Sequence, residues 1–404
     1  AQAWPTHRPV RARGPRQGSR GMPKKKGRGG VRGTGGRGAG RGHDGRQPVG
    51  STGRGIVRRP ETQKKSKSGR GRGRGASAPQ RRGDEKQRGK ALLGGVNRPV
   101  AEARGDGFTR HQEIVRAHND AIMAIVMTPD CIYTSSRDKK LKRWKTSRNS
   151  FGKFELTADL EVPLDDLCWC MTMAGEWIFC GLGSGDIMAF SKSGQQARLS
   201  GHTKRTNCLL VHENVLISGS SDGIVRCWQA DPATGAFGCT HTISEGIAGA
   251  TQCIAALNGY LWVGGSSGIS VVELASLRVV HQLKPNKFVA GFQIFQDHMI
   301  VAYADGSVRI FDANGVEKLS QQPLECGPIL CIAGLDSGPR LLCGHAKGQV
   351  SSVILPQFQL KLSWQALERC KVQSIACAGQ DGFFLLGAEN GNLQVWQRDD
   401  GADL

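Results

Sequence analysis

Short apolar runs separated by turn residues recur along the chain from about Phe108 onward. In the clearest example, apolar runs at 208–211 and 215–217 precede the pair Asp222-Gly223, and a third run ends at Trp228. Runs this short and this closely spaced are typical of strands rather than helices. A pair such as Asp222-Gly223 between two apolar runs is a strong signal for a hairpin turn. The pattern predicts antiparallel β-sheet.

The same unit recurs at nearly constant spacing. In seven copies a turn position is followed six residues later by the end of a strand, and Gly follows the turn position in every copy except the first, which has Lys139. The strand ends lie 46, 38, 45, 38, 42 and 43 residues apart, a mean of 42. A repeat of this size predicts a ring of small sheets. The strand ends are Trp144, Phe190, Trp228, Glu273, Phe311, Val353 and Trp396.

The third copy, with Gly201-His202, Asp222 and Trp228, resembles the motif of the WD40 family, whose repeats have this length. The resemblance implies an all-β fold, with a seven-bladed propeller over residues 108–398 and a short C-terminal tail, 399–404. It also implies that the His, the turn Asp and the Trp form a structural hydrogen-bonded network inside a blade, not a catalytic pair. Two copies retain all three residues: His118, Asp138 and Trp144, and His202, Asp222 and Trp228.

Closing such a ring requires the first and last blades to be joined. The seventh copy ends near Arg398, and the inner strand of the first begins after His118. We therefore predict that Phe108–Arg116 forms the outer strand of the seventh blade.

Three copies carry a more particular pattern. The segments Glu176–Gly181, Cys326–Cys331, Pro339–Cys343 and Gly382–Gly387 are similar to the WD40 half of the plant-type CCCH zinc-finger WD40 proteins. A CCCH finger needs three cysteines and a histidine around zinc, and no cysteine precedes Cys131. The zinc function is therefore not expected here; either the N-terminal segment replaces the finger, or a longer chain carries it.

Residues 1–107 differ sharply from the repeats. They contain 29 Lys and Arg against 6 Asp and Glu, a net charge of +23, whereas the remainder has 26 against 28, a net of −2, which together give +21. With 26 glycines and few apolar residues, this segment cannot bury enough surface to offset its ordering entropy, so we predict a disordered tail.

The tail is similar to the Arg-Gly-rich segments of RNA-binding and nucleolar proteins. Guanidinium groups can fork onto phosphate or stack on bases, and glycine lets the backbone follow an irregular phosphate path. A disordered polycation also binds any polyanion through counterion release, so a passive tail or a nuclear address is the alternative. The candidate RNA-binding residues are Arg28, Arg32, Arg37, Arg41, Arg70, Arg72 and Arg74.

The thirteen cysteines all lie between Cys131 and Cys377. An odd, scattered set favours reduced thiols, and with the basic tail we expect a nuclear or nucleolar location, which can be shared with the cytoplasm. Cys168-Trp-Cys170 has both sulfurs on one strand face, but without a second pair at zinc-finger spacing we interpret the cysteines as core residues. We expect no metal, no cofactor and no membrane-spanning segment.

Basic residues also cluster in the first and third repeats. We predict that Lys139, Lys140, Lys204 and Arg205 lie on a rim that binds partners, since such a rim favours nucleic acid or an acidic peptide. Ordinary solvated charge is the alternative.

No acid–base or nucleophilic constellation survives this structural interpretation, so no catalytic residues and no enzyme activity are expected. Our first hypothesis is an RNA-associated scaffold: the tail supplies charge-driven affinity for RNA, and a monomeric propeller recruits protein partners. The second is a substrate- or adaptor-recognition subunit of a ubiquitin-ligase or signalling assembly, in which the tail only localises the propeller.

Overall fold

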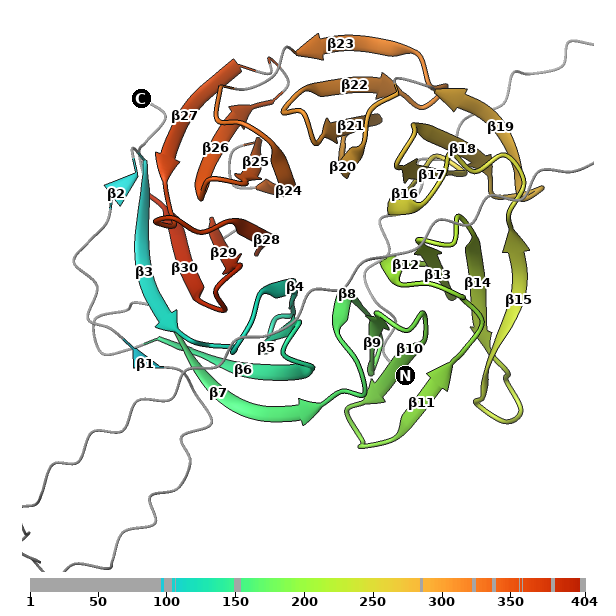
Figure 1. The fold of residues 1–404 in the computed structure, drawn as a ribbon, viewed down its shortest axis with the longest axis horizontal. Helices are drawn as coiled ribbons and strands as arrows, with labels where there is room; N and C mark the ends of the chain where they lie inside the picture. Colours follow the sequence, from blue (N-terminus) through green and yellow to red (C-terminus); the bar gives the residue numbers. More distant parts are fainter. Residues whose placement is uncertain are drawn as a thin grey trace, which may run out of the picture. The chain divides into compact units, whose positions relative to one another are not determined.

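Seven antiparallel sheets surround a common axis in the computed structural model (Figure 1). The structure describes residues 96–97, 104–105, 107–148, 154–283, 286–321, 325–335, 339–355, 357, 359–378 and 382–399, all within the unit Glu85–Leu404. This part of the chain contains strands and turns but no helix, and so no helix that could span a membrane. The predicted all-β fold and the count of seven blades are confirmed.

Each blade is a meander of four strands running from the axis outward. Blade one contains β4 (Ile122–Met127), β5 (Cys131–Ser136), β6 (Lys140–Arg148) and β7 (Phe154–Pro163). Blade two contains β8 (Cys168–Ala174), β9 (Trp177–Leu182), β10 (Ile187–Ser191) and β11 (Gln196–Leu199). Blade three contains β12 (Thr206–His212), β13 (Val215–Ser220), β14 (Val225–Ala230) and β15 (Phe237–Ile243). Blade four contains β16 (Thr251–Leu257), β17 (Tyr260–Gly265), β18 (Ile269–Glu273) and β19 (Arg278–Leu283).

The remaining blades follow the same order. Blade five contains β20 (Val289–Phe295), β21 (His298–Tyr303), β22 (Val308–Asp312) and β23 (Glu317–Gln321). Blade six contains β24 (Ile329–Leu335), β25 (Arg340–His345), β26 (Gln349–Ile354) and β27 (Gln359–Gln365). Blade seven contains β28 (Val372–Cys377), β29 (Phe383–Ala388) and β30 (Leu393–Arg398), and its fourth strand is β3 (Phe108–Val115).

The ring is closed by two strands that lie far apart in the sequence. β3 pairs antiparallel with β30, from Phe108 opposite Arg398 to Ile114 opposite Leu393, and the two ribbons lie side by side in Figure 1. The predicted closing strand is therefore confirmed. Two short strands that we did not predict, β1 (Val96–Asn97) and β2 (Arg104–Gly105), pair with the other edge of β3.

The hydrophobic core lies between neighbouring blades. The second strand of each blade is almost wholly buried because it is covered on both faces, which explains its near-continuous apolar and small residues. One such layer packs Phe179 and Ile187 of blade two against Leu216 and Trp228 of blade three. Since every blade shares its core with both neighbours, a blade with a degenerate motif is held by the next.

Candidate functional site: the connection face

One face of the propeller carries both the connections between blades and the turn after the second strand of each blade. In all seven blades, a backbone N–H of that turn donates to the carbonyl of the residue at or near the end of the preceding connection, at 2.8–3.1 Å; in blade three, Ser221 donates to Arg205. These bonds fix the loops against each other, and we call this side of the ring the connection face. Its side chains stand on a rigid frame, as a binding surface requires.

Blade three contains a continuous hydrogen-bond network behind this face. Trp228 Nε1 donates to Ser218 Oγ at 2.8 Å, and Ser218 Oγ lies 2.8 Å from His202 Nε2. His202 Nδ1 lies 3.0 Å from Asp222, whose carboxylate also accepts the backbone N–H of Thr203. The network links the third strand, the second strand, the connection and the turn of a single blade.

Blade one repeats this arrangement with threonine in place of serine. Trp144 Nε1 donates to Thr134 Oγ1 at 2.8 Å, His118 Nε2 lies 2.7 Å from the same oxygen, and His118 Nδ1 lies 3.0 Å from Asp138. The hydrogen bonds thus join the residues that the sequence grouped together. They also include Thr134 and Ser218, which our sequence analysis missed. The two residues occupy equivalent positions in the second strands of their blades, and this equivalence was the available signal.

Burial determines the protonation of these groups. Desolvation lowers the pKa of His118 and of His202, so both rings are neutral near pH 7. Burial alone would raise the pKa of Asp138, but hydrogen bonds from His118 and from the backbone of Asn119 hold it below its usual range. A neutral imidazole that donates from Nδ1 and accepts at Nε2 satisfies every member of the chain. The network therefore serves to stabilise the blade.

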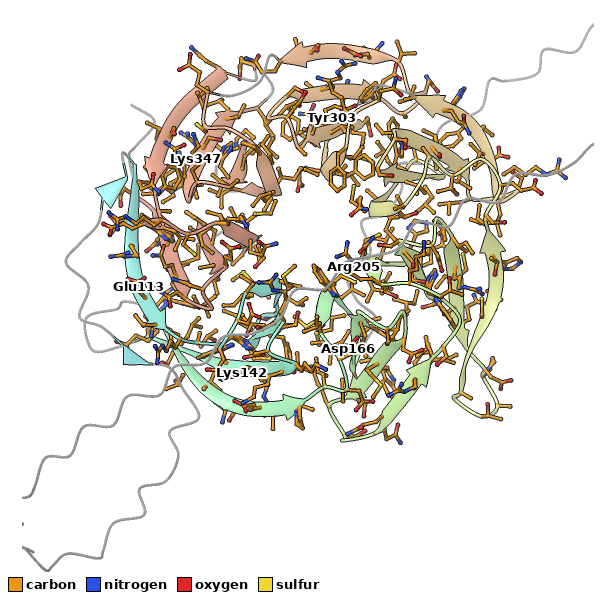
Figure 2. All side chains as sticks on the ribbon, viewed as in Figure 1. Glu113, Lys142, Asp166, Arg205, Tyr303 and Lys347 are labelled. Atoms are coloured by element: carbon orange, nitrogen blue, oxygen red, sulfur yellow. The ribbon has the colours of Figure 1, made fainter. Side chains whose placement is uncertain are left out.

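The basic strand of blade one is neutralised by its neighbour. Glu161 on β7 accepts from Lys140 Nζ at 2.5 Å and from Lys142 Nζ at 3.1 Å, and Asp159 pairs with both Arg143 and Lys145. Hydrogen bonds from the two lysines hold the pKa of Glu161 below its usual range, although burial opposes this. We predicted that Lys140 lies on the rim, but it belongs to this cross-strand ladder of ion pairs. Its neighbour in the ladder, Lys142, lies within blade one and away from the axis in Figure 2.

The other three rim residues lie in the turn of blade one and the connection before blade three. Lys139 is half exposed and lies 3.5 Å from a carboxylate oxygen of Asp166. Lys204 is exposed, whereas Arg205 is partly buried. The guanidinium carbon of Arg205 lies 4.0 Å from the centre of the Trp169 ring, a cation–π contact between blades two and three, and Figure 2 labels Arg205 near the axis.

Trp169 is the functional candidate that sequence reasoning missed. It is the extra residue of a β-bulge between Cys168 and Cys170, and every blade has such a bulge on its inner strand. A bulge re-aims one side chain, which leaves Trp169 partly exposed between two buried cysteines. The aromatic residue inside Cys-Trp-Cys was a signal, but we considered only the sulfurs.

Eight of the thirteen cysteines are buried and four are partly buried, but Cys239 on β15 is exposed, so the interpretation of the cysteines as core residues does not hold for it. Cys170, Cys208, Cys253 and Cys331 follow the inner-strand bulge of their blades, and burial raises the pKa of each thiol. In the described part of the chain, no group of three or more His, Cys, Asp or Glu side chains is arranged to hold a metal ion. The Arg28 to Arg74 set lies outside the described residues.

Comparisons with known proteins find a WD repeat in this chain and relatives among plant zinc-finger proteins. A model of the WD domain, G-beta repeat matches residues 193–229. Zinc finger CCCH domain-containing protein 62 of Arabidopsis thaliana is 23% identical over 70% of this chain and 68% of its own length. Zinc finger CCCH domain-containing protein 17 of Oryza sativa subsp. japonica is 22% identical over 70% of this chain and 65% of its own length. WD repeat-containing protein 1 of Gallus gallus is 31% identical over 29% of this chain and 20% of its own length.

Solved structures agree on the fold. The WD40 β-propeller domain of Doa1 superposes with a TM-score of 0.62 at 14% identity, covering 73% of this chain and 99% of that domain. The computationally designed Ika8 protein gives a TM-score of 0.53 at 17% identity, covering 70% and 98%. The chain is a WD40-repeat protein, similar over 70% of its length to plant CCCH zinc-finger WD40 proteins.

Proposed function

We propose that this chain is a non-enzymatic scaffold whose propeller binds protein partners through the connection face while its Arg/Gly-rich segment associates with RNA. The observation that carries the first half is a difference in charge pairing. Lys139 and Lys140 lie against carboxylates, whereas Arg205 stacks on Trp169 and has no carboxylate partner among the described residues. A partly desolvated, unpaired cation costs stability unless a ligand completes it. Arginine beside tryptophan is also the composition of an interface anchor.

The RNA half is supported by sequence. The 29 basic residues of 1–107 are interleaved with glycine, and the opposing 6 acidic residues neutralise little of that charge. Such a segment supplies charge-driven affinity that falls steeply with salt. The proposal also includes a nuclear or nucleolar location, because the ligand is RNA. It further includes a monomeric propeller.

Crosslinking to RNA and protein recovery from cells test the proposal on the full chain and on residues 96–404, which keep β1 and β2. We expect RNA recovery to disappear with the N-terminal segment, while protein partners remain on the propeller. RNA recovered equally well without residues 1–95 would overturn the role of the segment. RNA-independent partners that belong to a ubiquitin-ligase or signalling assembly, with no RNA on the full chain, would support the second hypothesis instead.

A charge-matched variant separates guanidinium chemistry from simple charge. Changing Arg28, Arg32, Arg37, Arg41, Arg70, Arg72 and Arg74 to lysine keeps the net charge of the full chain but removes forked hydrogen bonds and stacking. Weaker RNA crosslinking by this variant at equal salt supports specific use of arginine. Unchanged crosslinking would show that the segment binds RNA through its positive charge alone.

A further inference from the structure

The strongest unexplained feature of the connection face is the way in which Arg205 is held. Asn207 donates its side-chain amide to Ser221 Oγ at 2.9 Å and to the carbonyl of Thr251 at 2.6 Å, so its carboxamide is fixed by two neighbouring blades. The oxygen of that carboxamide then accepts Arg205 Nε at 2.5 Å. With Trp169 against its face, the guanidinium is oriented from one edge and one side before any ligand arrives.

This arrangement leaves the other edge of the guanidinium available. No described residue accepts a hydrogen bond from the two terminal nitrogens of Arg205, and neither nitrogen is closed off from solvent. A guanidinium edge that presents two parallel N–H groups matches the two oxygens of a carboxylate. Burial lowers the pKa of Arg205, which marks the group as partly desolvated, and an ion pair is stronger where water is partly excluded.

The surrounding charges decide which anion fits. Lys139 pairs with Asp166, and Arg198 pairs with both Asp165 and Asp186. Asp222 also lies on this face, where its carboxylate accepts the backbone N–H of Thr203, so Lys204 and Arg205 are the cations of this group that no described carboxylate pairs. A carboxylate fills the one free edge of the guanidinium with a single negative charge, whereas the second charge of a phosphate would also meet the aspartates of this face, such as Asp166 beside Trp169.

We propose that the connection face recognises an acidic segment of a partner protein by inserting one aspartate or glutamate carboxylate against the free edge of Arg205, beside Trp169. This rests on the proposed function, since it names the chemistry of the protein partner on that face. Lys204 is exposed next to the site and strengthens the attraction of an acidic segment. The pre-oriented guanidinium lowers the entropic cost of binding.

A subtractive selection tests this inference. A random library of 12-residue peptides is selected on the full wild-type chain at physiological salt and depleted on the full Arg205→Gln chain. Because both carry the same basic N-terminal segment, peptides held only by that segment are removed. We expect the surviving peptides to share one Asp or Glu, and its change to Asn or Gln to weaken binding by about tenfold or more. Arg205→Lys should give an intermediate loss, because it keeps the charge without the fork.

The controls keep the outcomes distinct. Arg226→Gln removes an arginine of blade three that bonds to Thr242 instead of Asn207, and should bind the peptides like wild type. Thermal unfolding of each variant confirms that the propeller is folded. Survivors without a common acidic residue would overturn this inference and leave the scaffold proposal standing, whereas a selection that enriches no peptide would count against both. Phosphoserine that binds more tightly than glutamate through Arg205 would overturn the assignment to a carboxylate.

Discussion

Phe108, the first residue of the closing strand, stacks on Trp364 of blade six, with ring centroids 4.8 Å apart and planes 21° apart. Phe108 is 1% exposed and also meets the edge of Phe384 in blade seven. The closing strand is therefore fastened by side-chain packing between blades as well as by its pairing with β30. We predict that Phe108→Ala lowers the free energy of unfolding by about 3–5 kcal/mol, because it removes this buried ring. Denaturant unfolding of the full chain measures the loss.

A matched phenylalanine provides the control. Phe288 is 44% exposed, so Phe288→Ala should change stability by no more than about 0.5 kcal/mol. Equal losses for the two variants would show that the contacts of Phe108 do not fasten the ring.

The hydrogen-bond network of blade three gives a second prediction. Ser218→Ala removes the hydroxyl that joins Trp228 to His202 and leaves two buried nitrogens without partners. We expect a loss of about 1–3 kcal/mol in the free energy of unfolding. Ser218→Thr should remain close to wild type, since blade one uses Thr134 at the same point of its own network.

The stability of the Ser218 variants is compared with that of a serine variant at the surface. Ser193→Ala, in an exposed turn, serves as the surface control. If Ser218→Ala were as stable as Ser193→Ala, the network would not contribute to folding stability.

Periodicity explains why so much of the fold was predictable. Each hairpin turn, such as that at Asp222-Gly223, lies at a fixed distance from the end of the next strand, and this local geometry is written directly in the residue order. Ring closure followed from topology, because a closed ring needs a partner for β30. β1 and β2 were not predictable in this way, since a strand of two residues has no alternation to detect.

The candidate site was less predictable because it depends on long-range register. The sequence indicated a basic rim, but it did not show that Glu161 pairs with Lys140 while Arg205 lacks a carboxylate. Nor did it show that the bulge at Trp169 brings an indole from blade two against a guanidinium from the connection to blade three. Such contacts follow from how two blades meet, and no short motif encodes them.

A third prediction concerns the joint between blades three and four. Gly219 faces the sulfur of Cys208, and a Cβ at Gly219 would lie 2.7 Å from that sulfur and also clash with Thr251. We expect Gly219→Ala to cost about 1–3 kcal/mol through overpacking. Cys208→Ala in the same chain should recover part of that cost, because it removes one of the two clashing groups.

A double-mutant cycle measures the recovery by denaturant unfolding of both single variants and the double variant. Strictly additive losses would contradict the proposed contact, since residues that touch are expected to couple by about 0.5–3 kcal/mol.

The buried histidines make stability depend on pH. Burial lowers the pKa of His118, His202 and His345 from 6.5. Below about pH 6.5 the unfolded chain therefore binds protons at these rings that the folded chain resists, so the free energy of unfolding must fall as the pH decreases through this range. The lowered pKa of Asp138 and of Asp222 adds a further loss only below about pH 4, where unfolded carboxylates bind protons first.

The slope between pH 7.5 and 5.5 isolates the histidine contribution. His202→Gln removes one of the three buried rings, so its unfolding free energy should depend less steeply on pH than that of wild type, whatever its absolute stability. An unchanged slope in His202→Gln would mean that this ring binds a proton as readily in the folded propeller as in the unfolded chain, and that the hydrogen bonds to Asp222 and Ser218 do not require the neutral form.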